Sequence, residues 1–140
     1  MKITIQRLND DVHMKATNED GVSLEMDGSD DIGGINSGFR PMQMLLAAAG
    51  GCSTIDIIGI LKKKRQNPED IKIEVTGERI KKGTYTEFSE IHMHYIFKGD
   101  LNPKQVEKAI DLSLGKYCSV TKTLEKTAKV TSSYEIVNES

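Results

Sequence analysis

The sequence predicts an α+β fold, and three features of its patterning support this prediction. Short N-terminal segments alternate apolar and polar residues, as half-buried strands do. A long and nearly all-apolar stretch follows Arg40-Pro41 and exceeds the length of an ordinary strand. Further alternating segments and helical patterns come after it. Strands and helices are therefore grouped along the chain, whereas a doubly wound sheet would alternate them.

The composition fits one ordinary globular domain, and we assign residues 1–140 to a single domain. The chain has 140 residues, of which 37% are hydrophobic and 29% charged, and its formal net charge is -2. This balance argues against disorder and gives no reason to expect a nucleic-acid partner. The first residues lack the continuous apolar core of a signal peptide, so we expect a cytoplasmic protein with no membrane partner.

Three strands are expected before the long apolar stretch. Residues 2–8 and 11–17 alternate, and the segment 22–27 follows a turn at Glu19-Asp20-Gly21. Residues 28–38 are rich in glycine, serine and aspartate. They form either a linker or a mobile loop over a site, because long loops in compact domains are often functional.

The apolar stretch predicts a long helix that begins near Pro41, a suitable first helical residue, and ends by Asn67-Pro68. Between Pro41 and Leu61 the one formal charge is Asp56. The stretch approaches the length of a membrane span, but its alanines, glycines and polar breaks indicate a helix buried nearly all round. A single small domain supplies too little cover for such a helix. We therefore expect a homodimer that buries two of them.

The second half of the chain adds strands and shorter helices. Ile71, Ile73 and Val75 alternate in a strand that reaches about Lys81. A helix is predicted to begin after Asn102, because asparagine is a favoured N-cap residue. The remaining predicted elements are a strand over 87–97, a helix over 117–127 and a closing strand over 129–137.

Of the two cysteines, Cys52 has the more suggestive surroundings. A free cysteine is usually a small apolar residue of the core, and in a reducing compartment a cysteine rarely forms a structural disulfide. Gly50-Gly51 directly before Cys52 costs about 1 kcal/mol per residue against alanine inside a helix. The pair therefore indicates a close backbone approach or a local break, with room for a partner or small substrate beside the sulfur. Tight helix packing is the plain alternative, and it is compatible with a functional thiol.

Thiol chemistry at Cys52 needs support for a thiolate. If the helix is continuous from Pro41, its dipole cannot give that support, because Cys52 lies far beyond the first turn. Arg40 adjoins the helix start but lies about 18 Å along the axis from Cys52. Either Gly50-Gly51 interrupts the helix, or a cation reaches the thiol across a bend or from a second chain.

Two motifs together resemble a known family. The run from Arg40 to Asp56, which contains Gly-Gly-Cys-Ser-Thr-Ile-Asp, and the later Lys116-Tyr117-Cys118-Ser119-Val120 closely resemble the OsmC/Ohr superfamily. The glycine pair and the closing Ser133-Tyr134-Glu135-Ile136-Val137 are most similar to its YhfA-type branch. The resemblance runs along essentially the whole chain. It implies an OsmC-like α+β fold, in which strands flank a long buried central helix and two chains form an intertwined homodimer with sites at the interface.

The resemblance also implies a reaction. Cys52 matches the peroxidatic cysteine, which attacks the O–O bond of an organic hydroperoxide and becomes a sulfenic acid. Cys118 matches the resolving cysteine, which condenses with it to a disulfide. An external dithiol would then reset the enzyme by exchange. The implied role is a peroxiredoxin-like oxidoreductase of the oxidative stress response, whose partners are a small hydroperoxide, a dithiol reductant and a second copy of the chain.

One position departs from the family pattern. Family peroxidases hold the thiolate with an Arg–Glu pair, and their glutamate follows the helix-starting proline, where this chain has Met42 and then Gln43. The matching arginine would lie near the N-terminal strands, where Arg7 is available. Arg40, Gln43 and Arg7 are therefore the supporting candidates. The missing glutamate favours an alternative function, that of a non-catalytic stress-response protein that binds a small hydrophobic ligand or senses oxidation.

The sequence predicts neither a metal site nor a cofactor. His92 and His94 share one strand face, and two such histidines can bind a metal. No third ligand has a suggestive spacing, so a polar outer face is the better interpretation. Asp56, one turn after Cys52, is expected to accept a hydrogen bond, and Tyr117 is expected in the core.

Overall fold

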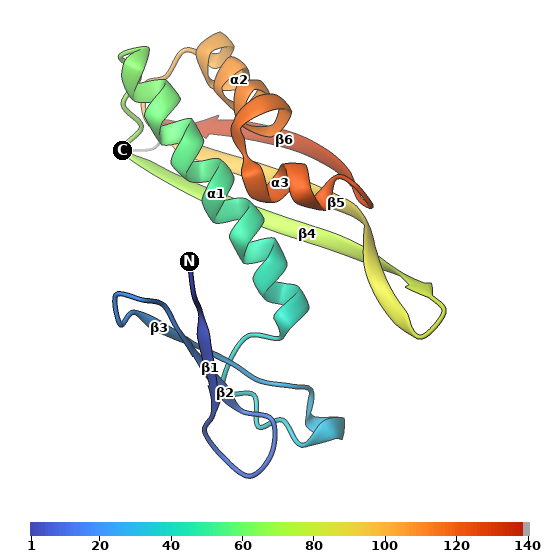
Figure 1. Cartoon of the computed structure of the whole chain (residues 1–140). Helices are drawn as coiled ribbons and strands as arrows, with labels where there is room; N and C mark the ends of the chain where they lie inside the picture. Colours follow the sequence, from blue (N-terminus) through green and yellow to red (C-terminus); the bar gives the residue numbers. More distant parts are fainter. Residues whose placement is uncertain (139–140) are drawn as a thin grey trace. The chain divides into compact units, whose positions relative to one another are not determined.

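The computed structural model describes residues 1–138, and the predicted order of elements along the chain is confirmed (Figure 1). The chain divides into two compact units. We call the first, Met1–Leu45, unit 1, and the part from Leu46 onward unit 2. The long helix α1 (Pro41–Lys63) begins in unit 1 and continues as the first element of unit 2. The assignment of residues 1–140 to one domain stays a prediction.

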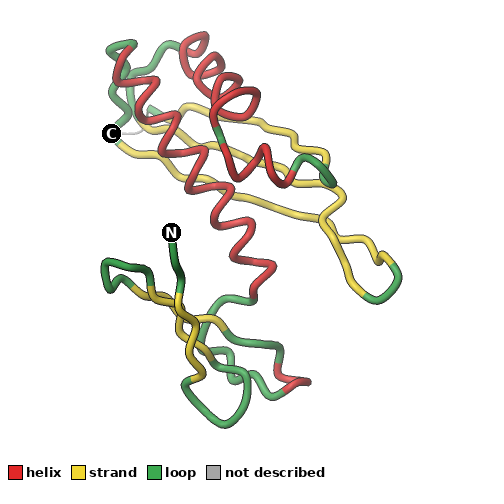
Figure 2. Tube along the Cα trace, in the orientation of Figure 1, coloured by secondary structure: helices red, strands yellow, loops and turns green. Residues whose placement is uncertain are grey.

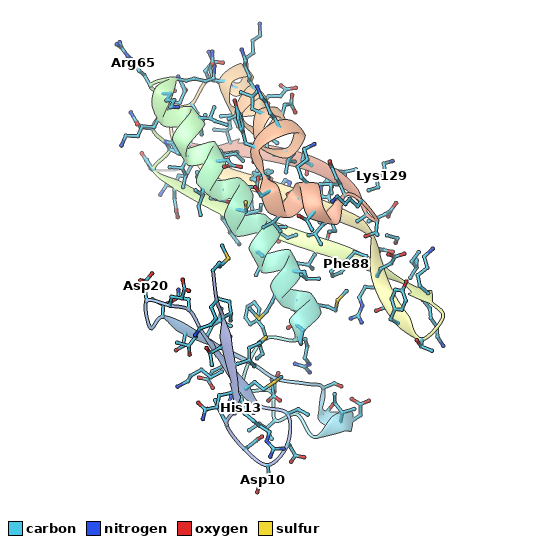
Figure 3. The ribbon with its side chains drawn as sticks, viewed as in Figure 1. Asp10, His13, Asp20, Arg65, Phe88 and Lys129 are labelled. Carbon is cyan, nitrogen blue, oxygen red and sulfur yellow. The ribbon has the colours of Figure 1, made fainter. Side chains whose placement is uncertain are left out.

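Unit 1 contains a three-stranded antiparallel sheet in which neighbours in sequence pair in order. The second strand begins later than predicted, at Met14, because the Asn9 side chain accepts a hydrogen bond from the His13 amide and closes a wide turn there. Figure 3 places Asp10 at the tip of this turn and Asp20 in the next one. The strands are β1 (Thr4–Arg7), β2 (Met14–Thr17) and β3 (Ser23–Met26).

The loop over residues 28–38 is anchored to the buried Asp27. The Asp27 carboxylate accepts hydrogen bonds from the amides of Gly28 at 2.8 Å, Ile35 at 3.0 Å and Ser37 at 3.1 Å. These hydrogen bonds hold the pKa of Asp27 below its ordinary value, and the bond from the Ser37 amide has the largest effect. The loop is therefore tied into unit 1, so it is not a linker.

Replacing Asp27 with asparagine is expected to loosen this loop and to flatten the acid dependence of stability. The folded pKa of Asp27 lies below the value of about 3.9 for an unfolded aspartate. The ionised group therefore stabilises the fold above that pH, and the effect is lost as the pH falls through the folded pKa. In Asp27→Asn, amide hydrogen exchange at Ile35 and Ser37 should accelerate at neutral pH, and acid should change the free energy of unfolding less than in the wild type.

The control is Asp20→Asn, which neutralises an exposed carboxylate in a turn of the same unit. It should leave both the exchange rates and the acid dependence at their wild-type values. Equal exchange rates at Ile35 in the two variants would contradict the anchoring role of Asp27.

Unit 2 is a three-stranded sheet with α1 and the later helices on one of its faces (Figures 1 and 2). The first two strands of this sheet are antiparallel, and the second and third are parallel. A parallel pair needs a long crossover connection, which the helices supply. The elements after α1 are β4 (Asp70–Lys82), β5 (Tyr85–Lys98), α2 (Pro103–Leu112), a π-helical turn (Ser113–Tyr117), α3 (Ser119–Leu124) and β6 (Lys129–Val137).

The helix predicted over 117–127 is shorter than expected. Cys118 has an extended backbone, with φ -73° and ψ 100°, and caps α3 by accepting the Thr121 amide on its sulfur. Tyr117 therefore belongs to the preceding π-helical turn. Its side chain is 51% exposed, so the prediction of a core position was wrong.

Helix α1 is continuous through Gly50-Gly51, which excludes a break there. A Cβ atom on Gly50 would lie 2.9 Å from the side-chain atom Cγ2 of Val75 on β4, so the helix backbone packs closely on a side chain of β4 at Gly50, whereas nothing lies within 4 Å of a Cβ atom on Gly51. One stripe of α1 is buried, whereas Ile55 on another face is 73% exposed. Burial nearly all round is therefore wrong for a single chain, because the one sheet of unit 2 covers only one side of the helix.

By length and composition alone, α1 could cross a membrane, but the core helix of a soluble protein passes the same test. In unit 2 the buried stripe of α1 contributes to the hydrophobic core together with β5 and α2. Met93, Tyr95 and Phe97 point inward from β5 and are fully buried. The helix is thus an integral part of this core.

Replacing Gly50 with alanine is expected to lower the free energy of unfolding, although alanine has the higher helix propensity. The propensity gain is about 1 kcal/mol, whereas overpacking a core costs about 1–3 kcal/mol. The new methyl group would meet Val75, whose branched side chain is stiff. We expect a net loss of up to about 2 kcal/mol in urea denaturation. The double variant Gly50→Ala/Val75→Ala should lose less than the two single variants together, and strict additivity would show that no collision occurs.

Candidate active site

The two cysteines meet in unit 2. The sulfur atoms of Cys52 and Cys118 and a carboxylate oxygen of Asp56 all lie within 4.8 Å of one another. Cys52 and Asp56 are one turn apart on α1, and Cys118 comes from the N-cap of α3. Both cysteines are free thiols, so this spacing is that of a reduced pair, compared with about 2.05 Å between the sulfurs of a disulfide. Such a pair fits a redox role.

The two thiols differ in their access to solvent. Cys52 is partly exposed, whereas Cys118 is fully buried. Burial raises the pKa of the Cys118 thiol, and hydrogen bonds from Thr121 partly offset this effect. The Thr121 amide donates to the Cys118 sulfur at 3.4 Å, and its hydroxyl lies 2.8 Å from the same atom. A substrate that enters from solvent would therefore reach Cys52 first. Cys118 is protonated at neutral pH, because its pKa is raised.

A buried polar network positions Asp56. The Ser113 hydroxyl donates to the Asp56 carboxylate at 3.2 Å, and its oxygen lies within hydrogen-bond distance of the Ser53 hydroxyl, at 3.1 Å. Ser53 is also hydrogen-bonded to the hydroxyl of Tyr95 on β5. Burial raises the pKa of Tyr95 to about 12, so this hydroxyl keeps its proton at neutral pH. The network thereby links the carboxylate beside the thiols to the core of the sheet.

Four residues of this site were missed by the sequence analysis: Ser53, Ser113, Tyr95 and Thr121. Ser53 carries a signal, because a hydroxyl in an otherwise apolar helix needs a buried partner. Tyr95 carries a weaker one, as a polar-tipped residue on the inward face of an alternating strand. Ser113 and Thr121 have no comparable signal, since their roles depend on the path of the chain between α2 and α3.

The predicted supporting residues Arg40, Gln43 and Arg7 belong to unit 1 and have partners there. The Gln43 side chain accepts the Arg40 amide at 3.0 Å, so it caps α1. The Arg40 guanidinium donates to the Asn36 side chain at 3.3 Å. The Arg7 guanidinium donates to the backbone carbonyl of Asp10 at 3.3 Å. A role for these three residues at the cysteine pair stays a prediction.

The histidines of β5 bind neighbouring side chains on β6. His92 is hydrogen-bonded to Thr131 at 2.7 Å and to Ser133 at 2.8 Å. His94 is hydrogen-bonded to Ser133 at 2.7 Å and to Glu135 at 3.3 Å. Both rings alternate with the buried residues of β5. They therefore contribute to a polar outer face of the sheet, as expected.

The fold and the cysteine pair together define a class of protein. The family profile described as OsmC-like protein matches residues 33–133. The chain belongs to this family, which confirms the predicted relationship and the predicted α+β fold. The family match includes both cysteines and the whole of α1.

Individual relatives support the same placement. Protein YhfA of Escherichia coli strain K12 is 44% identical over 121 residues, which cover 84% of each chain. The crystal structure of a hypothetical protein from Aquifex aeolicus VF5 has a TM-score of 0.84 at 30% identity and covers 99% of this chain and 97% of that one. An organic hydroperoxide resistance protein OsmC from Legionella pneumophila has a TM-score of 0.73 at 14% identity, with 96% and 97% covered. At that identity the likeness shows the fold alone.

Proposed function

We propose that the protein is a thiol-dependent reductase of organic hydroperoxides, in which Cys52 attacks the peroxide and Cys118 resolves the product. The observation that carries this proposal is the meeting of a partly exposed thiol and a buried thiol within 4.8 Å. The chain belongs to the OsmC-like family, and the protein from Legionella pneumophila that is named OsmC is also named an organic hydroperoxide resistance protein; we therefore take organic hydroperoxides as the oxidant.

In the first step, the Cys52 thiolate attacks the terminal, hydrogen-bearing oxygen of the hydroperoxide. An S–O bond forms, the O–O bond breaks, and the departing alkoxide takes up a proton and leaves as an alcohol. Sulfur is oxidised to the sulfenic acid, and the peroxide is reduced. Cys52 suits this step because it is the more accessible of the two thiols.

In the second step, Cys118 attacks the sulfenic sulfur of Cys52. An S–S bond forms, the S–O bond breaks, and the hydroxide leaves as water with the proton that Cys118 gives up. An external dithiol then reduces the disulfide by exchange and becomes oxidised itself. The cycle needs no bound cofactor, since all electrons come from thiols.

The functional form is proposed to be a cytoplasmic homodimer. Ile55 and Ile58 on α1 are 73% and 49% exposed in one chain, and a second copy would remove this apolar surface from water. A reducing compartment keeps both thiols ready for the first step. Light scattering should give the mass of two chains at micromolar concentration, and the mass of one chain would contradict the dimer.

Steady-state kinetics test the proposed activity against its alternative. Purified protein is mixed with cumene hydroperoxide and an excess of dithiothreitol, and peroxide consumption is followed. Many equivalents of peroxide consumed per chain would support the reductase. Oxidation that stops after about one equivalent per chain would instead indicate a stress-response protein that senses oxidation or binds a small hydrophobic ligand.

A further inference from the structure

The cluster of Cys52, Cys118 and Asp56 also has the composition of a metal site. One donor atom from each residue lies within 4.8 Å of the donor atoms of the other two. Cys52 and Asp56 are four residues apart on α1, so their side chains leave the same side of the helix. The sequence alone does not reveal this cluster, since Cys118 is far from the other two donors along the chain. The crossover between β5 and β6 brings it to them.

Two thiolates and one carboxylate are ligands that Zn²⁺ accepts in proteins. A Zn–S bond of about 2.3 Å in tetrahedral geometry places two sulfur ligands about 3.8 Å apart. The three donors therefore need shifts of no more than about 1 Å to share one ion. Cys52 and Asp56 are partly exposed, so the fourth position would be accessible to water. Three protein ligands with one open position are the pattern of a reactive zinc site rather than of a closed structural one.

The groups behind these donors are arranged as outer-shell partners are in metal sites. Thr121 directs its amide and its hydroxyl at the Cys118 sulfur, at 3.4 Å and 2.8 Å. Ser113 holds the Asp56 carboxylate at 3.2 Å and is itself fixed by Ser53. Such hydrogen bonds orient ligands before the metal arrives and raise its affinity. The site is thus prepared from two elements, α1 and the N-cap of α3.

We propose that the reduced protein binds one Zn²⁺ per chain through Cys52, Cys118 and Asp56. The bound ion engages the sulfur lone pairs that would attack a peroxide, so it protects the thiols from oxidation. Formation of the disulfide removes two ligands and releases the metal. Zinc binding does not depend on the proposed reductase activity. Only the protection of the thiols from oxidation rests on that proposed function.

Metal binding is tested on reduced, metal-free protein in the absence of peroxide. Zn²⁺ is titrated in competition with a chromogenic chelator, and Co²⁺ serves as a spectroscopic probe. We expect one equivalent per chain and the intense thiolate-to-cobalt charge-transfer band of a tetrahedral site. Cys52→Ser should weaken Zn²⁺ binding by more than about 100-fold, and Asp56→Asn by at least about 10-fold. Asp100→Asn, which neutralises an exposed carboxylate outside the cluster, should bind as the wild type does.

Three results would overturn the zinc site: no stoichiometric binding by the wild type, unchanged affinity in folded Cys52→Ser or Asp56→Asn, or a cobalt spectrum without thiolate bands. Circular dichroism of each variant shows that it is folded. Zinc binding without hydroperoxide turnover would support this inference and remove the proposed reductase. Hydroperoxide turnover without zinc binding would support the reductase and overturn the zinc site.

Discussion

Substituting Cys52 with serine is expected to lower kcat/KM for cumene hydroperoxide by roughly 10³-fold or more, because a serine hydroxyl is far less nucleophilic than a thiolate and cannot form a sulfenic acid. The change removes one sulfur atom from a partly exposed position on α1. It should therefore leave the packing of Ala49, Ser53 and Ile57 intact. The measurement is the initial rate of peroxide consumption with excess dithiothreitol.

Two controls make this result specific. The free energy of unfolding of Cys52→Ser should lie within about 1 kcal/mol of the wild-type value, since the substitution is close to isosteric. Ser119→Ala, which removes an exposed hydroxyl next to Cys118, should keep the wild-type rate. Unchanged turnover in Cys52→Ser would place the reaction at some other group.

Substituting Cys118 with serine is expected to separate the two steps of the cycle. The second-order rate of the first oxidation should stay within about two-fold of the wild type, because Cys52 keeps its access to solvent. Steady-state turnover should fall by more than about 10-fold, because the sulfenic acid then depends on the external thiol for its reduction. Stopped-flow kinetics and trapping of the sulfenic acid with dimedone measure the two effects. If the rate of the first oxidation fell as much as the steady-state turnover, Cys118 would also act in the first step.

The rate at which Cys118 forms the disulfide with oxidised Cys52 is expected to depend on pH. Burial raises the pKa of Cys118, so near neutral pH the residue is protonated and its reactive thiolate is scarce. The thiolate fraction grows about tenfold per pH unit below the pKa. Disulfide formation in the wild type should therefore accelerate as pH rises from about 6 to about 9. A rate that does not change over this range would contradict resolution by a buried thiol.

The order of elements could be predicted because local signals mark it. Pro41 marks the start of α1, and Asn102 caps α2 by accepting the Lys104 amide at 2.9 Å. The boundaries that differ depend on side-chain hydrogen bonds that no periodicity reveals. Asn9 delays the second strand, and the extended Cys118 separates α3 from the turn before it.

The site could be predicted only in part. Gly50 drew attention to Cys52, and its lack of a side chain does allow close approach to β4. The pairing of Cys52 with Cys118 came from the family resemblance, because their meeting depends on the long crossover between β5 and β6. The spacing of Cys52 and Asp56 on α1 brings these two together, but the approach of Cys118 to within 4.8 Å of Asp56 could not be derived, since it requires the path of the π-helical turn.

The exposure of individual side chains on α1 is a second feature that could not be predicted from the sequence. The composition of the helix gives its average polarity, but it does not say how much of the helix one chain covers. Ile57 is fully buried and Ile55 is 73% exposed, although both are isoleucines on the same helix. The difference arises because the sheet of unit 2 lies on one side of the helix only.

Cys52 and Cys118 are proposed to form a redox couple that reduces organic hydroperoxides. This couple can be observed by mass spectrometry after one equivalent of cumene hydroperoxide is added to the reduced protein. We expect one Cys52–Cys118 disulfide within each chain and release of an equal amount of cumyl alcohol. Two free thiols and unreacted hydroperoxide at the end of the incubation would contradict it.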